Sequence, residues 1–168
     1  LSETVLPRYI GTTLELLALV LAGVLVIGVG CAWLVASYEF PGRRALEWAL
    51  LLPLAMPAYV VAYAYTDLLQ FSGPVQTALR EYGGGLGLAG SFPDIRTTGG
   101  AALVFAFVLY PYVYLLTRIA FRRQSASLAD AGRTLGLSPL ESFVRVGLPL
   151  ARPAMAAGAA LALMETLA

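Results

Sequence analysis

Three long stretches of this sequence carry no charged residue, and they restrict the chain to folds that place them in an apolar environment. They cover residues 16–38, 48–66 and 97–117, and a fourth apolar stretch runs from Pro153 to residue 168. A helix rises about 1.5 Å per residue and a bilayer core is roughly 30 Å thick, so each of the three runs can cross a membrane. We therefore predict an all-α polytopic membrane protein with four transmembrane helices. The fourth is expected to be truncated, as in a piece of a larger protein.

The composition supports a membrane protein and argues against other classes. Hydrophobic residues make up 59% of the chain and charged residues 12%, which is too apolar for a soluble domain of this size. Histidine is absent and Cys31 is the single cysteine, so we expect no metal site and no disulfide framework. The net charge of +1 gives no reason to expect nucleic-acid binding. Residues 85–90 match G-x-G-x-x-G, but no predicted strand precedes them, and no cofactor is expected.

The arginine residues predict how the helices are oriented. Eight lie in the connections on one side of the predicted spans, and three (Arg8, Arg80 and Arg96) lie on the other. Because arginine accumulates in cytoplasmic loops, the N-terminus is expected outside, with residues 39–47 and 124–152 in the cytoplasm. The eight arginines are Arg43, Arg44, Arg118, Arg122, Arg123, Arg133, Arg145 and Arg152.

The cytoplasmic connection is predicted to form two short helices. Ser127 and Asp130 fit a first capping box, and Ser138 and Glu141 fit a second one with proline at the first helical position. Gly136 stands where a left-handed residue would end the first helix. Taken alone, these features also fit a helical hairpin packed under its own bundle.

The spacing of residues within this connection is its most specific feature. It reads Asp130-Ala131-Gly132, three residues, Gly136, nine residues, then Val146-Gly147-Leu148-Pro149. This pattern resembles the cytoplasmic loop E-A-A-x3-G-x9-I-x-L-P of ABC-transporter permeases of the type I importer class, with conservative changes at the Glu, second Ala and Ile positions. The resemblance implies that the loop receives force from an ATPase. The implied coupling residues are Asp130, Ala131, Gly132, Gly136, Leu140, Val146, Leu148 and Pro149.

The resemblance extends beyond the loop and covers most of the chain. Residues 40–44, 52–59, 63–67, 72–76, 109–114 and 164–168 are similar to permeases of the ferric-iron-type importers. This resemblance implies that residues 1–168 are one transmembrane permease domain fragment. The fragment would come from the first membrane half of a bacterial inner-membrane protein. The implied partners are cytoplasmic ABC ATPase subunits, a periplasmic substrate-binding protein, a second permease half or subunit, and membrane lipid. Thiamine and phosphonate importers have related permeases, and they stay open as alternatives to ferric iron.

Glu165, Tyr59 and Tyr63 are candidates for the translocation path. A carboxylate twelve residues beyond Pro153 is expected near the bilayer centre, where such groups usually face the protein interior. Tyr59 and Tyr63 are four residues apart and share a helix face. Tyrosine can ligate ferric iron, but the permeases that this chain resembles receive iron from a separate binding protein, so interfacial anchoring and hydrogen bonding between helices are the favoured roles of these phenols. For Glu165, a structural hydrogen bond to a neighbouring helix stays open beside the path role.

Other features have packing interpretations. Pro53, Pro57 and Pro111 each remove a backbone donor and are expected to bend their helices. Ala154, Gly158 and Ala162 recur every four residues and predict a close helix–helix contact. Gly28 and Gly30 are expected to act in the same way.

A second class of function would be a membrane channel or a membrane-embedded enzyme. An enzyme would require histidines, cysteines or clustered carboxylates at bilayer depth, and the apolar runs contain almost none. The chain also has no G-x-x-x-x-G-K-[ST] phosphate loop. We therefore predict a transport subunit that hydrolyses no ATP itself.

Overall fold

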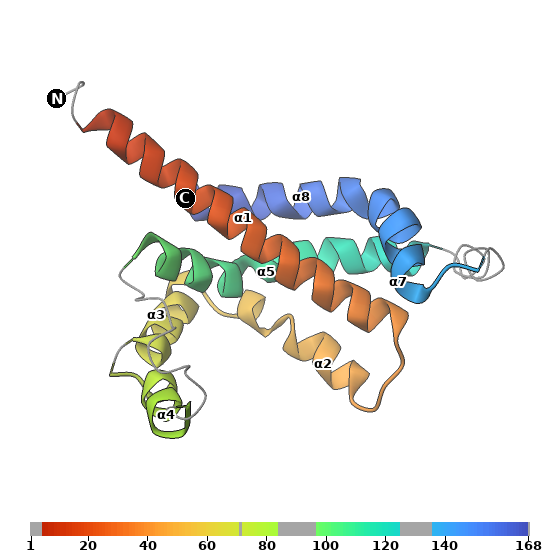
Figure 1. The fold of residues 1–168 in the computed structure, drawn as a ribbon, viewed down its shortest axis with the longest axis horizontal. Helices are drawn as coiled ribbons and strands as arrows, with labels where there is room; N and C mark the ends of the chain where they lie inside the picture. The colour runs from red at the N-terminus through yellow and green to blue at the C-terminus, as the bar shows by residue number, and fades with distance from the viewer. Residues whose placement is uncertain (1–4, 71, 84–96, 125–135, 168) are drawn as a thin grey trace.

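The computed structural model describes residues 5–70, 72–83, 97–124 and 136–167, and every regular element in these ranges is helical (Figure 1). The elements are α1 (Leu6–Ser37), α2 (Arg43–Ala49), the 3-10 turn η1 (Leu52–Ala55), α3 (Ala58–Leu69), α4 (Pro74–Gly83), α5 (Thr98–Arg123), α7 (Pro139–Ser142), the π-helical turn η3 (Phe143–Gly147) and α8 (Leu148–Leu167). Three helices are long and apolar enough to cross a membrane: Leu6–Ser37, Thr98–Arg123 and Leu140–Leu167. The predicted all-helical fold is confirmed for the described residues, which contain three candidate spans where four were predicted.

The expected second span, residues 48–66, is not one helix. It is divided among the end of α2, η1 and α3. Met56 is extended, because a residue that precedes proline is driven out of the helical region, and Pro57 then caps α3. The break leaves backbone groups without hydrogen-bond partners in their own helix. One of them, the Leu50 carbonyl, accepts a hydrogen bond from the Tyr110 hydroxyl of α5 at 3.0 Å. The prolines therefore interrupt this stretch more completely than a bend would.

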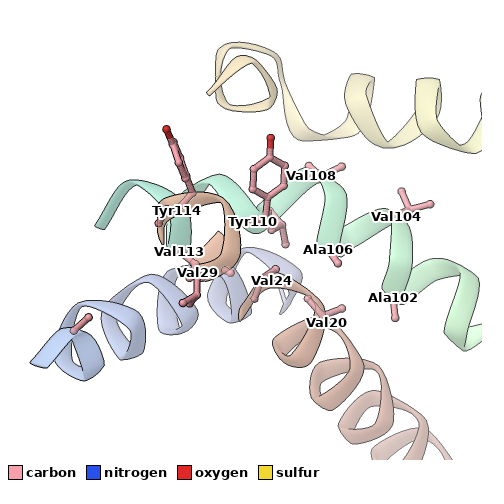
Figure 2. Packing of buried hydrophobic residues seen from close by; sticks show 14 of the residues in the cluster. Val20, Val24, Val29, Ala102, Val104, Ala106, Val108, Tyr110, Val113 and Tyr114 are labelled. Carbon is pink, nitrogen blue, oxygen red and sulfur yellow. The ribbon is translucent and has the colours of Figure 1, made fainter. Parts of the chain in front are cut away.

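The core of the molecule is formed around α5, which packs against both α1 and α8. Val20 and Val24 of α1 and Val113 and Tyr114 of α5 have no exposed surface. Figure 2 shows the α1 valines on one side of α5, while the hydroxyls of Tyr110 and Tyr114 point to the other side. The helix continues through Pro111. Each of the three long helices thus buries one side against the others.

Glycine allows the closest helix contacts. A Cβ atom at Gly28 would lie 2.8 Å from the Val113 Cβ, and one at Gly158 would lie 2.7 Å from the Val113 Cα. The close approach predicted for these two glycines is confirmed, and Ala162 is also fully buried on the same face of α8. The expectation for Gly30 is wrong, because no described residue lies within 4 Å of its Cβ position. A step of two residues along α1 thus moves a glycine from the helix contact to the outer surface.

The last long helix begins earlier than expected. We predicted that it would start near Pro153, but α8 starts at Leu148 and is continuous with η3 and α7. A proline in the first turn of a helix is tolerated, which accounts for Pro149. The turn before Pro149, Phe143–Gly147, is π-helical. Because Pro149 has no N–H, the Arg145 carbonyl lacks the donor that an α-helix would place there. The end of the predicted cytoplasmic connection is thus helical and joined directly to the span.

Candidate functional site

The candidate site lies where the chain enters the last long helix, residues 136–149. Five of the predicted coupling residues are described by the structure: Gly136, Leu140, Val146, Leu148 and Pro149. The other three, Asp130, Ala131 and Gly132, lie outside the described residues, as does the capping box predicted at Ser127.

The local geometry at the start of the site agrees with the sequence. Gly136 has φ of 73°, a left-handed conformation that other residue types adopt with strain. The Ser138 amide donates to Glu141 Oε2 at 2.9 Å, and the Glu141 amide donates to Ser138 Oγ at 3.3 Å. These reciprocal bonds satisfy two of the amides that a helix start leaves unpaired. The predicted turn at Gly136 and the second capping box are therefore confirmed.

Aromatic packing fixes this segment to the ends of α1 and α5. The Phe143 ring stacks on Trp33 with centroids 4.6 Å apart and meets Phe121 edge-on at 5.7 Å. Gln124 also reaches the segment, since its Nε2 donates to the Gly147 carbonyl at 3.0 Å. The segment is consequently held by side chains from two long helices as well as by its own continuation into α8.

The opposite side of the segment is open. Leu140 is 59% exposed and Val144 is 52% exposed, and Glu141 and Arg145 beside them are exposed too. Phe143 is next to Val144 in the sequence, but the structure turns it to the other side of the segment. Phe143 faces the bundle, while the two aliphatic residues face outward. An apolar pair flanked by charges on a firmly held turn is suited to contact with another protein.

A cluster of ion pairs between α2 and the end of α5 was not predicted from the sequence. Glu47 of α2 accepts hydrogen bonds from Arg43 at 3.1 Å, from Arg122 at 2.7 Å and from Arg118. Its side chain is only 13% exposed. The four-residue step from Arg43 to Glu47 is a visible sequence signal, whereas the partners from α5 lie more than 70 positions away.

The cluster bears on the predicted topology. It joins the connection after α1 to the end of α5, so Arg43, Arg118 and Arg122 lie at one end of the molecule. The arginine count had assigned these connections to the same side of a membrane, and this relative placement agrees with it. Which side is cytoplasmic stays a prediction.

The residues suggested for a translocation path are on the outside of the described chain. Tyr59 and Tyr63 of α3 are each 77% exposed, and Glu165 of α8 is exposed. No hydrogen bond or ion pair between described residues joins Glu165 to either tyrosine. Within the described ranges no group of three or more histidine, cysteine, aspartate or glutamate residues could hold a metal ion.

Comparison with known proteins relates this geometry to a family. The family described as "Binding-protein-dependent transport system inner membrane component" matches residues 7–168. A protein of Nephroselmis olivacea named "Probable sulfate transport system permease protein cysT" is 35% identical over 147 residues, which are 88% of this chain and 48% of that protein. A sulfate transport system permease protein of Salmonella typhimurium is 31% identical over 84% of this chain and 48% of its own length. A molybdenum transport system permease protein of Escherichia coli is 30% identical over 83% of this chain and 58% of its own length.

Two points follow from these relatives. The chain spans about half the length of the relatives it matches. Their names specify sulfate or molybdenum, so the ferric-iron specificity expected from the sequence motifs finds no support in them.

Proposed function

Because this chain belongs to the family of inner-membrane components of binding-protein-dependent transport systems, we propose that it is part of the permease subunit of an ATP-driven importer. In this proposal residues 1–168 form a single permease domain fragment, and a second membrane half or subunit completes the path. A binding protein delivers substrate from outside, and ATPase subunits act on the cytoplasmic side. The chain itself contributes the membrane path and the coupling surface.

The observation that carries the proposal is the way in which residues 136–149 are held. Phe143 and Gln124 attach the segment to the bundle, and the same segment continues into α8. A force applied to its outer side would therefore reach three long helices together. We propose that Leu140 and Val144 contact the ATPase there, together with Asp130, Ala131, Gly132 and Gly136, and that Val146, Leu148 and Pro149 transmit the movement to the last span.

For the substrate we propose a tetrahedral oxyanion, sulfate or molybdate. The support is the names of the relatives, which cover most of this chain. Ferric iron, thiamine and phosphonate are the competing substrates. The exposed positions of Glu165, Tyr59 and Tyr63 leave them available to a path shared with the second half of the permease.

The substrate is tested by uptake assays with the full-length permease, its ATPase and its binding protein. We expect ATP-dependent uptake of labelled sulfate or molybdate, and competition between oxyanions of similar shape. Uptake of ferric iron, thiamine or a phosphonate without oxyanion uptake would reject this assignment. Loss of uptake in an ATPase-inactive complex is the control for ATP dependence.

A substitution at Gly136 tests the coupling role. No atom of the described residues lies within 4 Å of the Cβ position there, so the expected effect of a side chain is conformational. Gly136→Val places a β-branched residue at positive φ, which costs about 1–2 kcal/mol, and we expect roughly tenfold slower uptake. Asparagine tolerates this conformation, so Gly136→Asn should retain most activity.

The measurements are uptake and co-purification of the ATPase, at equal amounts of membrane-inserted permease. Equal uptake by Gly136→Val and Gly136→Asn would show that the left-handed turn has no part in coupling.

A further inference from the structure

A groove opens beside the Glu47 ion-pair cluster. Its volume is about 690 Å³, and it is lined by Arg43, Arg44, Arg122, Glu39, Glu47 and Phe40. We call it the arginine groove. A volume of this size is within the range of small-molecule sites, roughly 300–1,000 Å³.

The arginine groove has a surplus of positive charge. One carboxylate, Glu47, is shared by the guanidinium groups of Arg43, Arg118 and Arg122. Glu39 adds little compensation, because it is 96% exposed and lies 3.8 Å from Arg43. Among the described residues no carboxylate lies within 4 Å of the exposed Arg44 guanidinium. An anion entering the groove would therefore meet arginines whose charge is only partly balanced.

Arg118 and Tyr114 do not line the groove, but they support it from behind, because Arg118 pairs with Glu47. The side chain of Arg118 is 14% exposed, and its Nε has no hydrogen-bond partner among the described residues. The same holds for the fully buried Tyr114 hydroxyl, over whose ring the Arg118 guanidinium lies at 5.9 Å. Arginine matches the geometry of phosphate, because its N–H groups can reach two oxygens at once.

The position of the groove favours a lipid over a dissolved anion. It lies where the long helices end, since α1 stops at Ser37 and α5 at Arg123 (Figure 1). Phe40 lines it, and Trp48 of the adjoining α2 is 75% exposed. Aromatic side chains of this kind sit at the boundary between lipid tails and headgroups, and basic pockets at the ends of spans bind anionic headgroups.

We propose that the arginine groove binds the phosphate of an anionic phospholipid such as phosphatidylglycerol. The guanidinium groups of Arg44 and Arg122 hold the phosphate, and the lipid tails extend along the apolar side of α2 and α5. This proposal does not depend on which substrate is imported, so failure of one leaves the other standing.

The test compares two exposed arginines at the same end of the molecule. Arg44 lines the groove and Arg123 does not, and neither has an ion-pair partner among the described residues. The full-length permease in its assembled complex is titrated with phosphatidylglycerol, and bound lipid is counted by native mass spectrometry. Phosphatidylcholine with the same acyl chains and inorganic phosphate serve as the other two probes.

Arg44→Gln is expected to weaken phosphatidylglycerol binding about fivefold, and Arg44→Gln with Arg122→Gln about thirtyfold. Arg123→Gln should bind like the wild type, and phosphatidylcholine binding should change in none of the variants. Arg44→Gln leaves the Glu47 ion pairs intact, so its result holds even if the double variant fails to fold. Equal binding by Arg44→Gln and wild type, or equal losses in Arg44→Gln and Arg123→Gln, would overturn the site. Displacement of phosphatidylglycerol by millimolar inorganic phosphate would overturn the lipid assignment.

Discussion

Replacing Gly158 with leucine is expected to prevent α5 and α8 from packing and to remove most of the folded permease. The Cβ position at Gly158 lies 2.7 Å from the Val113 Cα and 3.0 Å from the Tyr112 carbonyl oxygen. Both are backbone atoms, which cannot rotate aside as the end of a side chain can. Extra volume in a packed contact usually costs about 1–3 kcal/mol, and we expect at least about 3 kcal/mol here because two helices must separate.

The matched control is the neighbouring residue. Ala157 is exposed on the same turn of α8, so Ala157→Leu adds similar volume without entering the contact. The measurements are the yield of monodisperse full-length protein and its thermal unfolding midpoint in detergent. Gly158→Ala should fall between wild type and Gly158→Leu. Similar yields and midpoints for Gly158→Leu and Ala157→Leu would mean that α8 does not approach α5 in this way.

The second large effect is expected from Glu47→Gln. This change keeps the size of the side chain but leaves Arg43, Arg118 and Arg122 close together without their shared carboxylate. Removing one partner of a buried ion pair lowers the free energy of unfolding by about 3–5 kcal/mol. Since Arg122 is 46% exposed and solvent screens part of the repulsion, we expect a loss of about 2 kcal/mol.

Glu39→Gln is the control for this effect. Glu39 also faces Arg43, but it is 96% exposed, and its removal should change stability by less than about 0.5 kcal/mol. Thermal unfolding at low and high salt separates the two roles, because added salt should recover part of the Glu47→Gln loss by screening the arginines. A Glu47→Gln variant as stable as Glu39→Gln at low salt would show that the cluster does not hold α2 to α5.

Features that depend on neighbouring residues in the chain could be predicted. The left-handed turn at Gly136 and the capping box of Ser138 and Glu141 are set within four residues, and both are present. The long apolar helices could be predicted for a similar reason, because backbone groups in lipid must be satisfied within their own segment. Three of the four expected spans correspond to long helices.

The failures occurred where a distant part of the chain decides the outcome. The stretch 48–66 is apolar enough for a span, but its two prolines interrupt the helix. The Tyr110 hydroxyl of α5 donates a hydrogen bond to the Leu50 carbonyl in the interrupted stretch. Gly28 and Gly30 look equivalent in the sequence, and only the position of Val113 makes one of them a contact residue. Pro149 was expected in a connection, yet it lies in the first turn of α8.

The sequence by itself determined the membrane class, the long helices, the family motif and the turn at Gly136. These features depend on hydropathy, on proline and glycine geometry and on helix capping, all of which act over a few residues. Only the tertiary structure decided that Phe143 packs between Trp33 and Phe121 while Leu140 faces outward. It also decided that Glu47 meets Arg118 and Arg122, which lie on another helix. These contacts depend on the positions that α1, α2 and α5 take relative to one another. Packing and electrostatic interactions between residues far apart in the sequence set those positions, so no short stretch of sequence predicts them.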